Sequence, residues 1–233
     1  MSAALKIRYS LAAACFAALT ACTPQAQLLM AFLPDSTIPI LLGHFQKLDE
    51  SNRRRIGELE QQKDWAGLAK FAAENIAKDK SNASWWLVAG YAHAQLREHA
   101  RAIECFQEAV RLEPDVPEGW NLLAQTFRES GRSDRAVITL DNALRILRDS
   151  PVTVYLLGES YTDLRRNDLA AKAYQQAIQM DNGFIEAWAG LGRAYARSGR
   201  IGDARDVART LEKSAPQYSE MINREIAAAG GSR

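Results

Sequence analysis

Cysteine and histidine are both scarce in this chain of 233 residues. The cysteines are Cys15, Cys22 and Cys105, and the histidines are His44, His93 and His99. Two of the three cysteines lie close to the N-terminus, so the sequence cannot build a framework of structural disulfides. The histidines do not form a metal-ligand spacing with Cys105. We therefore predict no metal site in this protein.

An excess of charge of one sign is also lacking, because 29 Lys and Arg residues balance 28 Asp and Glu residues. Nucleic-acid binding needs a concentrated basic surface, so we predict no nucleic-acid partner. The 14 glycines stand mostly alone and form no phosphate-binding loop, and the carboxylates are spread evenly along the chain. These absences predict a protein that is not an enzyme and that has no catalytic residues, small-molecule substrate or non-covalent cofactor.

The segment that ends at Cys22 has the layout of an export signal. Lys6 and Arg8 precede an apolar run over 11–21, which is too short for a comfortable membrane span. The tetrapeptide Leu19-Thr20-Ala21-Cys22 resembles the lipobox of bacterial lipoproteins. The resemblance implies a signal peptide over 1–21 and a diacylglycerol group covalently attached to Cys22. An ordinary cleaved signal with an incidental cysteine is the alternative.

The same resemblance predicts where the protein is found. Thr23 rather than Asp follows the cysteine, which by analogy with Gram-negative lipoproteins favours the outer membrane, facing the periplasm of the bacterial envelope. Residues 22–48 would then join the lipid site to the rest of the chain. Their apolar stretch over 28–45 either lies on the membrane or a partner, or folds back as a cap on the segment that follows.

A constant 34-residue period dominates the rest of the sequence. Trp86, Trp120, Val154 and Trp188 recur at this spacing, and each is followed four residues later by Gly or Ala. Within each period, apolar residues recur at intervals of three and four, which predicts two amphipathic helices joined by a short turn. Such a period indicates stacked helix pairs rather than a single closed core.

The alternation of large and small residues resembles the tetratricopeptide repeat family, with its Trp, its Leu-Gly pair, its aromatic, its alanines and its terminal proline. The resemblance implies an all-α, right-handed superhelical solenoid of about five helix pairs. The expected units are 49–82 (degenerate), 83–116, 117–150, 151–184 and 185–218, followed by a capping helix and tail over 219–233.

In this family, the first helix of each pair lines an inner groove that holds a peptide or a helix of a partner protein. Transferred position by position, the groove residues expected here are Arg53, Leu87, Tyr91, Gln95, Asn121, Gln125, Arg128, Tyr155, Glu159, Arg193 and Arg197. Aromatic, amide and guanidinium groups suit a polypeptide ligand, because they provide rigid contact area and oriented hydrogen bonds. These positions do not reproduce the Lys-Asn pattern with which some members bind a chain-terminal carboxylate.

The combined prediction is a membrane-anchored scaffold that binds a partner polypeptide and helps to assemble an envelope complex. Relatives with this layout include the pilotin-type lipoproteins of type IV pilus secretins. The alternative is a regulatory subunit or adaptor of an envelope enzyme, in peptidase, cell-wall or exopolysaccharide machinery.

Overall fold

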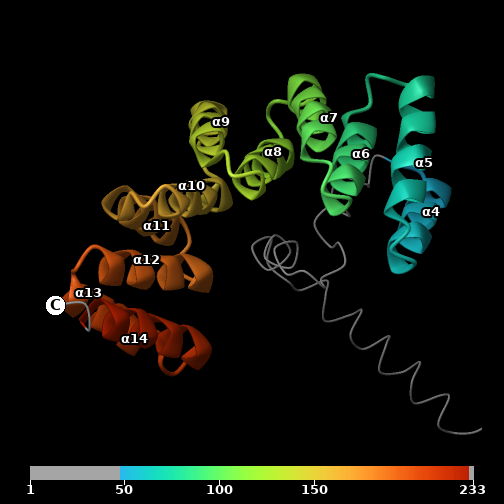
Figure 1. Ribbon diagram of the computed structural model, residues 1–233. Helices are drawn as coiled ribbons and strands as arrows, with labels where there is room; N and C mark the ends of the chain where they lie inside the picture. The colour runs from blue at the N-terminus through green and yellow to red at the C-terminus, as the bar shows by residue number, and fades with distance from the viewer. Residues whose placement is uncertain (1–47, 231–233) are drawn as a thin grey trace, which may run out of the picture. The chain divides into compact units, whose positions relative to one another are not determined.

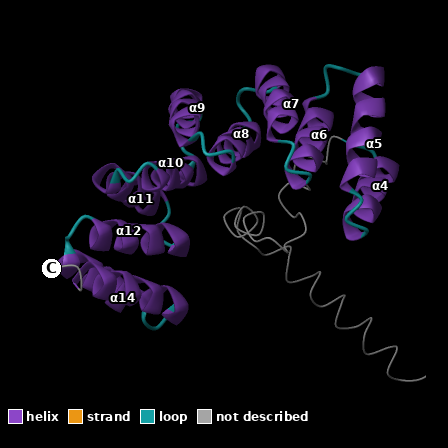
Figure 2. Cartoon of the chain, in the orientation of Figure 1, coloured by secondary structure: helices purple, strands orange, loops and turns teal. Residues whose placement is uncertain are grey.

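The computed structural model describes residues 48–230 and shows them as a series of α-helices (Figure 1). No strand occurs in this part of the chain (Figure 2). The predicted signal peptide, the lipid site at Cys22 and the apolar stretch over 28–45 lie outside the described residues, as do residues 231–233. The all-helical repeat architecture predicted from the sequence period is confirmed.

The helices form successive pairs that keep the register of the sequence. The first helices are α4 (Glu50–Gln61), α6 (Ala83–Gln95), α8 (Pro117–Glu129), α10 (Pro151–Asp163) and α12 (Ile185–Arg197). The second helices are α5 (Trp65–Lys78), α7 (His99–Leu112), α9 (Ser133–Ile146), α11 (Asn167–Met180) and α13 (Ile201–Leu211). The ends of the first helices follow one another at the constant period of the sequence, so no insertion interrupts the five units.

The turn inside each unit has the same backbone shape throughout the array. Its central residue adopts a positive φ in every unit, at Lys63, Arg97, Gly131, Arg165 and Gly199, with φ between 52° and 80°. Glycine reaches this left-handed region without a steric cost, whereas the other three residues adopt it against their intrinsic preference. The surrounding hydrogen bonds enforce the turn even where the sequence offers no glycine.

The recurring tryptophans tie neighbouring units together. The indole Nε1 of Trp86 donates to the carbonyl oxygen of Lys80 at 3.0 Å, and that of Trp120 to Pro114 at 2.8 Å. Trp188 makes the same bond to Asn182 at 3.0 Å. Each acceptor lies six residues earlier, in the loop that leaves the preceding unit. Val154 occupies this place in the fourth unit, is fully buried, and has no side-chain donor to make the bond.

Close approach of the helices depends on matched small and large residues. A Cβ atom added to Gly90 would lie 2.6 Å from the ring of Phe106, and one added to Gly158 would lie 2.7 Å from the ring of Tyr174. The Tyr174 ring also meets Gly190, where an added Cβ would lie at 2.6 Å. Tyr174 is 1 % exposed, so its ring fills the space between α10 and α12 completely.

The end of the array departs from the constant period. Helix α14 (Pro216–Gly230) begins three residues earlier than the period counted from Ile185 would give, because α13 is three residues shorter than the other second helices. The capping helix expected to begin at Ser219 therefore includes Pro216. Helix α14 contacts both α12 and α13, so it takes the place of the first helix of a further unit. Ile222, fully buried, then corresponds to Leu191 of the preceding unit.

The contacts between helices identify the inner side of the array. From α6 onward, each first helix contacts the first helix of the next unit, including α8 with α10 and α12 with α14. Within the described residues, no contact of similar extent joins one second helix to the next. The first helices are therefore crowded together and the second helices spread apart, which places the first helices on the inner wall.

A polar wall along the first helices

Nine of the eleven side chains predicted for the groove are exposed or half-buried on the first helices. These nine are Arg53, Tyr91, Gln95, Gln125, Arg128, Tyr155, Glu159, Arg193 and Arg197. They come from the five first helices α4, α6, α8, α10 and α12. The first helices therefore present a continuous series of amide, aromatic and guanidinium groups.

Two residues predicted for the groove are instead buried. Leu87 is 2 % exposed and Asn121 is 3 % exposed, so both belong to the packed interior. Asn121 Oδ1 accepts a hydrogen bond from Thr153 Oγ1 at 2.9 Å, which joins α8 to α10. The prediction transferred family positions without their packing. Asn121 is enclosed where α8 contacts α10, and Leu87 belongs to the interior around α6.

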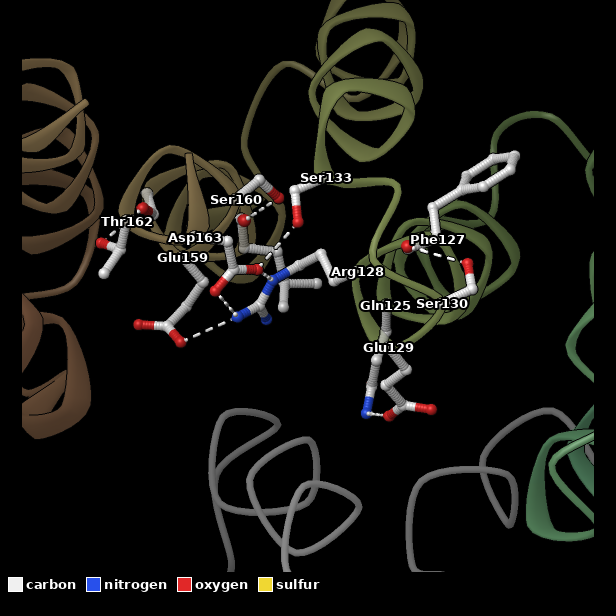
Figure 3. A network of polar contacts seen from close by, with 12 residues as sticks. Gln125, Phe127, Arg128, Glu129, Ser130, Ser133, Glu159, Ser160, Thr162 and Asp163 are labelled. Atoms are coloured by element: carbon white, nitrogen blue, oxygen red, sulfur yellow. Dashed lines mark hydrogen bonds and ion pairs between the residues drawn. The ribbon is translucent and has the colours of Figure 1, made fainter. Parts of the chain in front are cut away.

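Arg128 is held in a network that spans two units (Figure 3). Its Nε lies 2.7 Å from Asp163 Oδ2, and its Nη2 lies 3.1 Å from Glu159 Oε2. The Ser133 hydroxyl also donates to Asp163 Oδ2 at 3.1 Å. Because the Arg128 side chain is only 15 % exposed, two carboxylates neutralise a charge that is largely withdrawn from water. Arg128 therefore joins α8 to α10 and has little capacity left for a ligand.

Tyr174 of the second helix α11 also holds Glu159 in place. The Tyr174 hydroxyl donates to Glu159 Oε1 at 2.6 Å and lies 3.0 Å from Thr162 Oγ1. Burial raises the pKa of Tyr174 well above its usual value, and the nearby Glu159 charge adds to this effect. The phenol therefore remains a hydrogen-bond donor, and it orients the carboxylate that receives Arg128.

Helix α12 contributes two arginines to the wall, of which one has a carboxylate partner and the other has none among the described residues. Arg197 makes a two-pronged contact with Glu225 of α14, with Nε at 3.1 Å and Nη2 at 2.6 Å from its carboxylate oxygens. This hydrogen bond is the main reason that the pKa of Glu225 is lowered. Arg193 lies one turn earlier on α12, and its buried Nε has no hydrogen-bond acceptor.

The first unit contributes a buried carboxyl group. Glu60, at the end of α4, is 8 % exposed, and its Oε1 has no hydrogen-bond partner. Burial raises its pKa from 4.5 to about 7. The pKa of Tyr91 on α6 is raised by burial and further by the Glu60 charge, so the two groups are neighbours. The Tyr91 ring also packs edge-on against Trp65, with the ring centroids 5.7 Å apart.

Other features of the described residues give no reason for a catalytic or metal centre. No group of three His, Cys, Asp or Glu residues that could hold a metal ion occurs among residues 48–230. Cys105 is half-buried, and burial together with Glu104 raises its pKa to about 11, which disfavours the reactive thiolate. Of the helices described here, none has the length and apolar character to cross a membrane.

A shallow cleft of about 330 Å³ lies on α11, α12 and α13. Its apolar lining includes Trp188, Leu191 and Tyr195, and Asp203 and Asp206 lie at its edge. Both carboxylates already pair with arginines, Asp203 with Arg200 at 2.7 Å and Asp206 with Arg209 at 3.1 Å. The cleft therefore offers apolar area with little uncompensated charge.

Several important residues are absent from the prediction. Glu225 and Asp163 neutralise the wall arginines, and Tyr174 supports Glu159 from a second helix. Asp163 could have been predicted. It is the thirteenth residue of the unit 151–184, and the equivalent residue of the unit 185–218 is Arg197, which was predicted for the groove. The partner role of Glu225 depends on the early start of α14, which the constant period does not predict.

Comparison with known families agrees with this geometry. Family models described as tetratricopeptide repeat match residues 68–117, 87–151 and 161–223, which together cover more than half of the chain. The chain belongs to the tetratricopeptide repeat family. Relatives that it matches include Superkiller protein 3 of Schizosaccharomyces pombe, 29 % identical over 133 residues, and Protein bimA of Emericella nidulans, 24 % identical over 155 residues.

These curated relatives are much longer than the chain. The match covers 54 % of this chain but 10 % of Superkiller protein 3, and 66 % of this chain but 15 % of Protein bimA. The tetratricopeptide resemblance is therefore a resemblance of repeats, and the activities of the longer proteins do not transfer with it.

Solved structures reproduce the tetratricopeptide fold over most of the chain. PilW, described as a widely conserved type IV pilus biogenesis factor, aligns with a TM-score of 0.64 and 19 % identity, covering 76 % of this chain and 84 % of PilW. MamA aligns with a TM-score of 0.60 and 21 % identity, covering 71 % and 90 %. YrrB, described as having an unusual peptide-binding site, aligns at 0.57 and 17 %, covering 70 % and 84 %. At these identities the likeness shows the fold alone.

Proposed function

We propose that this protein is an interaction scaffold that binds a partner polypeptide along the inner wall of its array, held at the outer membrane of the bacterial envelope and facing the periplasm. The family supports a protein partner as the ligand class. The observation that carries the proposal is the accessible series Tyr91, Gln95, Gln125, Tyr155 and Arg193 on consecutive first helices. Such a series provides rigid aromatic area and hydrogen-bond donors over a length that suits a chain rather than a small molecule.

Assembly of an envelope complex of the pilus type is the role that we propose for this scaffold. The lipobox-like tetrapeptide ending at Cys22 supports the location, and the similarity of fold to the pilus biogenesis factor PilW supports the process. The lipid would hold the array close to the membrane, because acyl chains contribute about 0.8 kcal/mol per buried methylene.

Site-specific photocrosslinking in the living cell tests the scaffold role. A photoreactive residue in place of Gln95 or Gln125, on the inner wall, should yield a discrete adduct with one envelope protein. The matched positions Lys172 and Gln176, exposed on the second helix α11, should yield at least about tenfold less of it. Mass spectrometry of the adduct identifies the partner. An adduct formed only from the α11 positions would place the interface on the outer side and contradict the proposal.

Replacement of the proposed lipid site tests the anchor separately. Cys22→Ser removes the thiol that would take the diacylglycerol group, so the protein should move from the membrane pellet to the soluble periplasmic fraction. Cys105→Ser serves as the matched control and should leave the protein in the pellet. If the Cys22→Ser protein still sediments with membranes, lipidation at this residue is not the anchor.

A further inference from the structure

Three arginines of the inner wall lie between α8 and α12, and two of them already have carboxylate partners. Arg128 is paired with Glu159 and Asp163, and Arg197 is paired with Glu225. Arg193 lies between these two clusters along the wall, and among the residues that the structure describes it has no ion pair. Of these three arginines, Arg193 is therefore the one whose charge the described residues do not neutralise.

The surroundings of Arg193 make this unpaired state costly. Its Nε is shielded from water and has no acceptor, although the residue as a whole is only half-buried. A buried donor without a partner is destabilising, because it has lost its hydrogen bonds to water and gained none in exchange. Such groups are rare in folded proteins, and each calls for an explanation, of which an absent ligand is one.

The charge of Arg193 affects groups on both neighbouring first helices. The charge of Arg193 acts on Tyr155 of α10, whose pKa is raised mainly by burial, and also on Glu225 of α14. The carboxylate of Glu225 is occupied by both nitrogens of the Arg197 contact. Arg193 therefore lies on α12, between α10 and α14, within electrostatic range of Tyr155.

We propose that Arg193 binds the side-chain carboxylate of an Asp or Glu residue in the polypeptide that occupies the inner wall. Guanidinium groups bind carboxylates through two parallel hydrogen bonds, so a carboxylate is the ligand that best matches an unpaired arginine. A side chain rather than a chain terminus fits, because the wall continues on both sides of Arg193. This proposal rests on the scaffold function proposed above.

Selection from a random display library of 12-residue peptides against the full chain tests this site. Peptides selected on the wild type should be enriched in Asp or Glu, and Arg193→Gln should abolish the enrichment. The dissociation constant of a selected peptide should rise about tenfold to a hundredfold with Arg193→Gln, as expected for a hydrogen-bonded charge. Arg200→Gln, which removes a surface arginine paired with Asp203, should not change it.

A double-mutant cycle makes the assignment specific. Changing the acidic residue of the peptide to its amide should weaken binding to the wild type by the same factor, and should add little in the Arg193→Gln variant. Arg193→Lys provides a second variant that keeps the charge and should retain part of the affinity. Binders that are insensitive to Arg193, or that lack acidic residues, overturn this site alone. A selection that yields no binder overturns the groove itself.

Discussion

Replacing Tyr174 by Ala should lower the free energy of unfolding of the array by about 3–5 kcal/mol, the range for removal of a buried aromatic side chain. Tyr174 is 1 % exposed, and its ring fills the space left by Gly158 and Gly190 on two different first helices. The truncation leaves a cavity between the fourth and fifth units and takes the phenol donor away from Glu159. Urea unfolding followed by far-UV circular dichroism measures the loss.

Two further variants separate packing from hydrogen bonding. Tyr174→Phe keeps the ring and removes only the hydroxyl, so it should cost about 1–2 kcal/mol. Glu159 then loses one donor but keeps Arg128. A loss below about 1 kcal/mol for Tyr174→Ala would show that the array collapses around the missing ring, contrary to the close packing described here.

The pairing of residue sizes can be tested by transfer between units. The third unit combines Ala124 with Leu140 at the places where the fourth combines Gly158 with Tyr174. Gly158→Ala alone should be destabilising, because the new methyl group would lie 2.7 Å from the Tyr174 ring. Together with Tyr174→Leu, the same substitution should cost less than the sum of the two single changes. Simple additivity would contradict a direct contact between the two places.

The helical repeat could be predicted from sequence because its signals are local and repeated. Three- and four-residue apolar spacing predicts the helices, and a constant period over five units predicts that each unit stacks on the next. The helix ends at Gln95, Glu129, Asp163 and Arg197 follow this period without an error of even one residue. The period cannot predict where the structure departs from it, as it does at the short α13 and the early start of α14.

The sequence could predict which helices contribute to the candidate site, but not which of its side chains are buried or paired. A family position says which face of a helix a residue occupies, and Tyr91, Gln95 and Gln125 are indeed not buried. It does not say how closely adjacent first helices pack, and Asn121 is buried where α8 contacts α10. Nor does it say which charges pair, because Arg128 meets Asp163 from another helix, far away in sequence. Exposure and pairing are properties of the assembled stack.

The tryptophans illustrate the same limit. Their period marks them as part of the repeat, and an apolar face explains their aromatic bulk. Their indole nitrogens have a separate use, because each donates to a carbonyl oxygen in the loop before its own unit. The spacing of apolar residues does not indicate which loop carbonyl oxygens are available as acceptors. The sequence pattern therefore identified the residue, and only the structure identified the bond that it makes.

Replacing Glu60 by Gln should stabilise the first unit at pH 8 by about 3 kcal/mol and should have little effect at pH 4. Burial raises the pKa of this carboxyl group from 4.5 to about 7. At a pH between 4.5 and about 7, the Glu60 carboxyl group keeps its proton in the folded chain and releases it in the unfolded chain. The free energy of unfolding therefore falls as the pH rises through this range. Above this range the whole cost of a buried charge is present, at about 1.4 kcal/mol for each unit by which the pKa is raised.

Amide hydrogen exchange in α4, α5 and α6, followed at both pH values, measures this effect where it occurs. The terminal units of a repeat array can open without the rest, so the protection of these helices reports the first unit more directly than a global transition does. Glu58→Gln is the matched control on the same helix. Its side chain is 45 % exposed, so the substitution relieves no comparable burial. Equal protection of wild type and Glu60→Gln at pH 8 would show that the carboxylate finds a partner when it ionises. In that case the unpaired Oε1 of Glu60 would not destabilise the folded chain. A cationic group of the partner polypeptide would then not increase its stability by binding there.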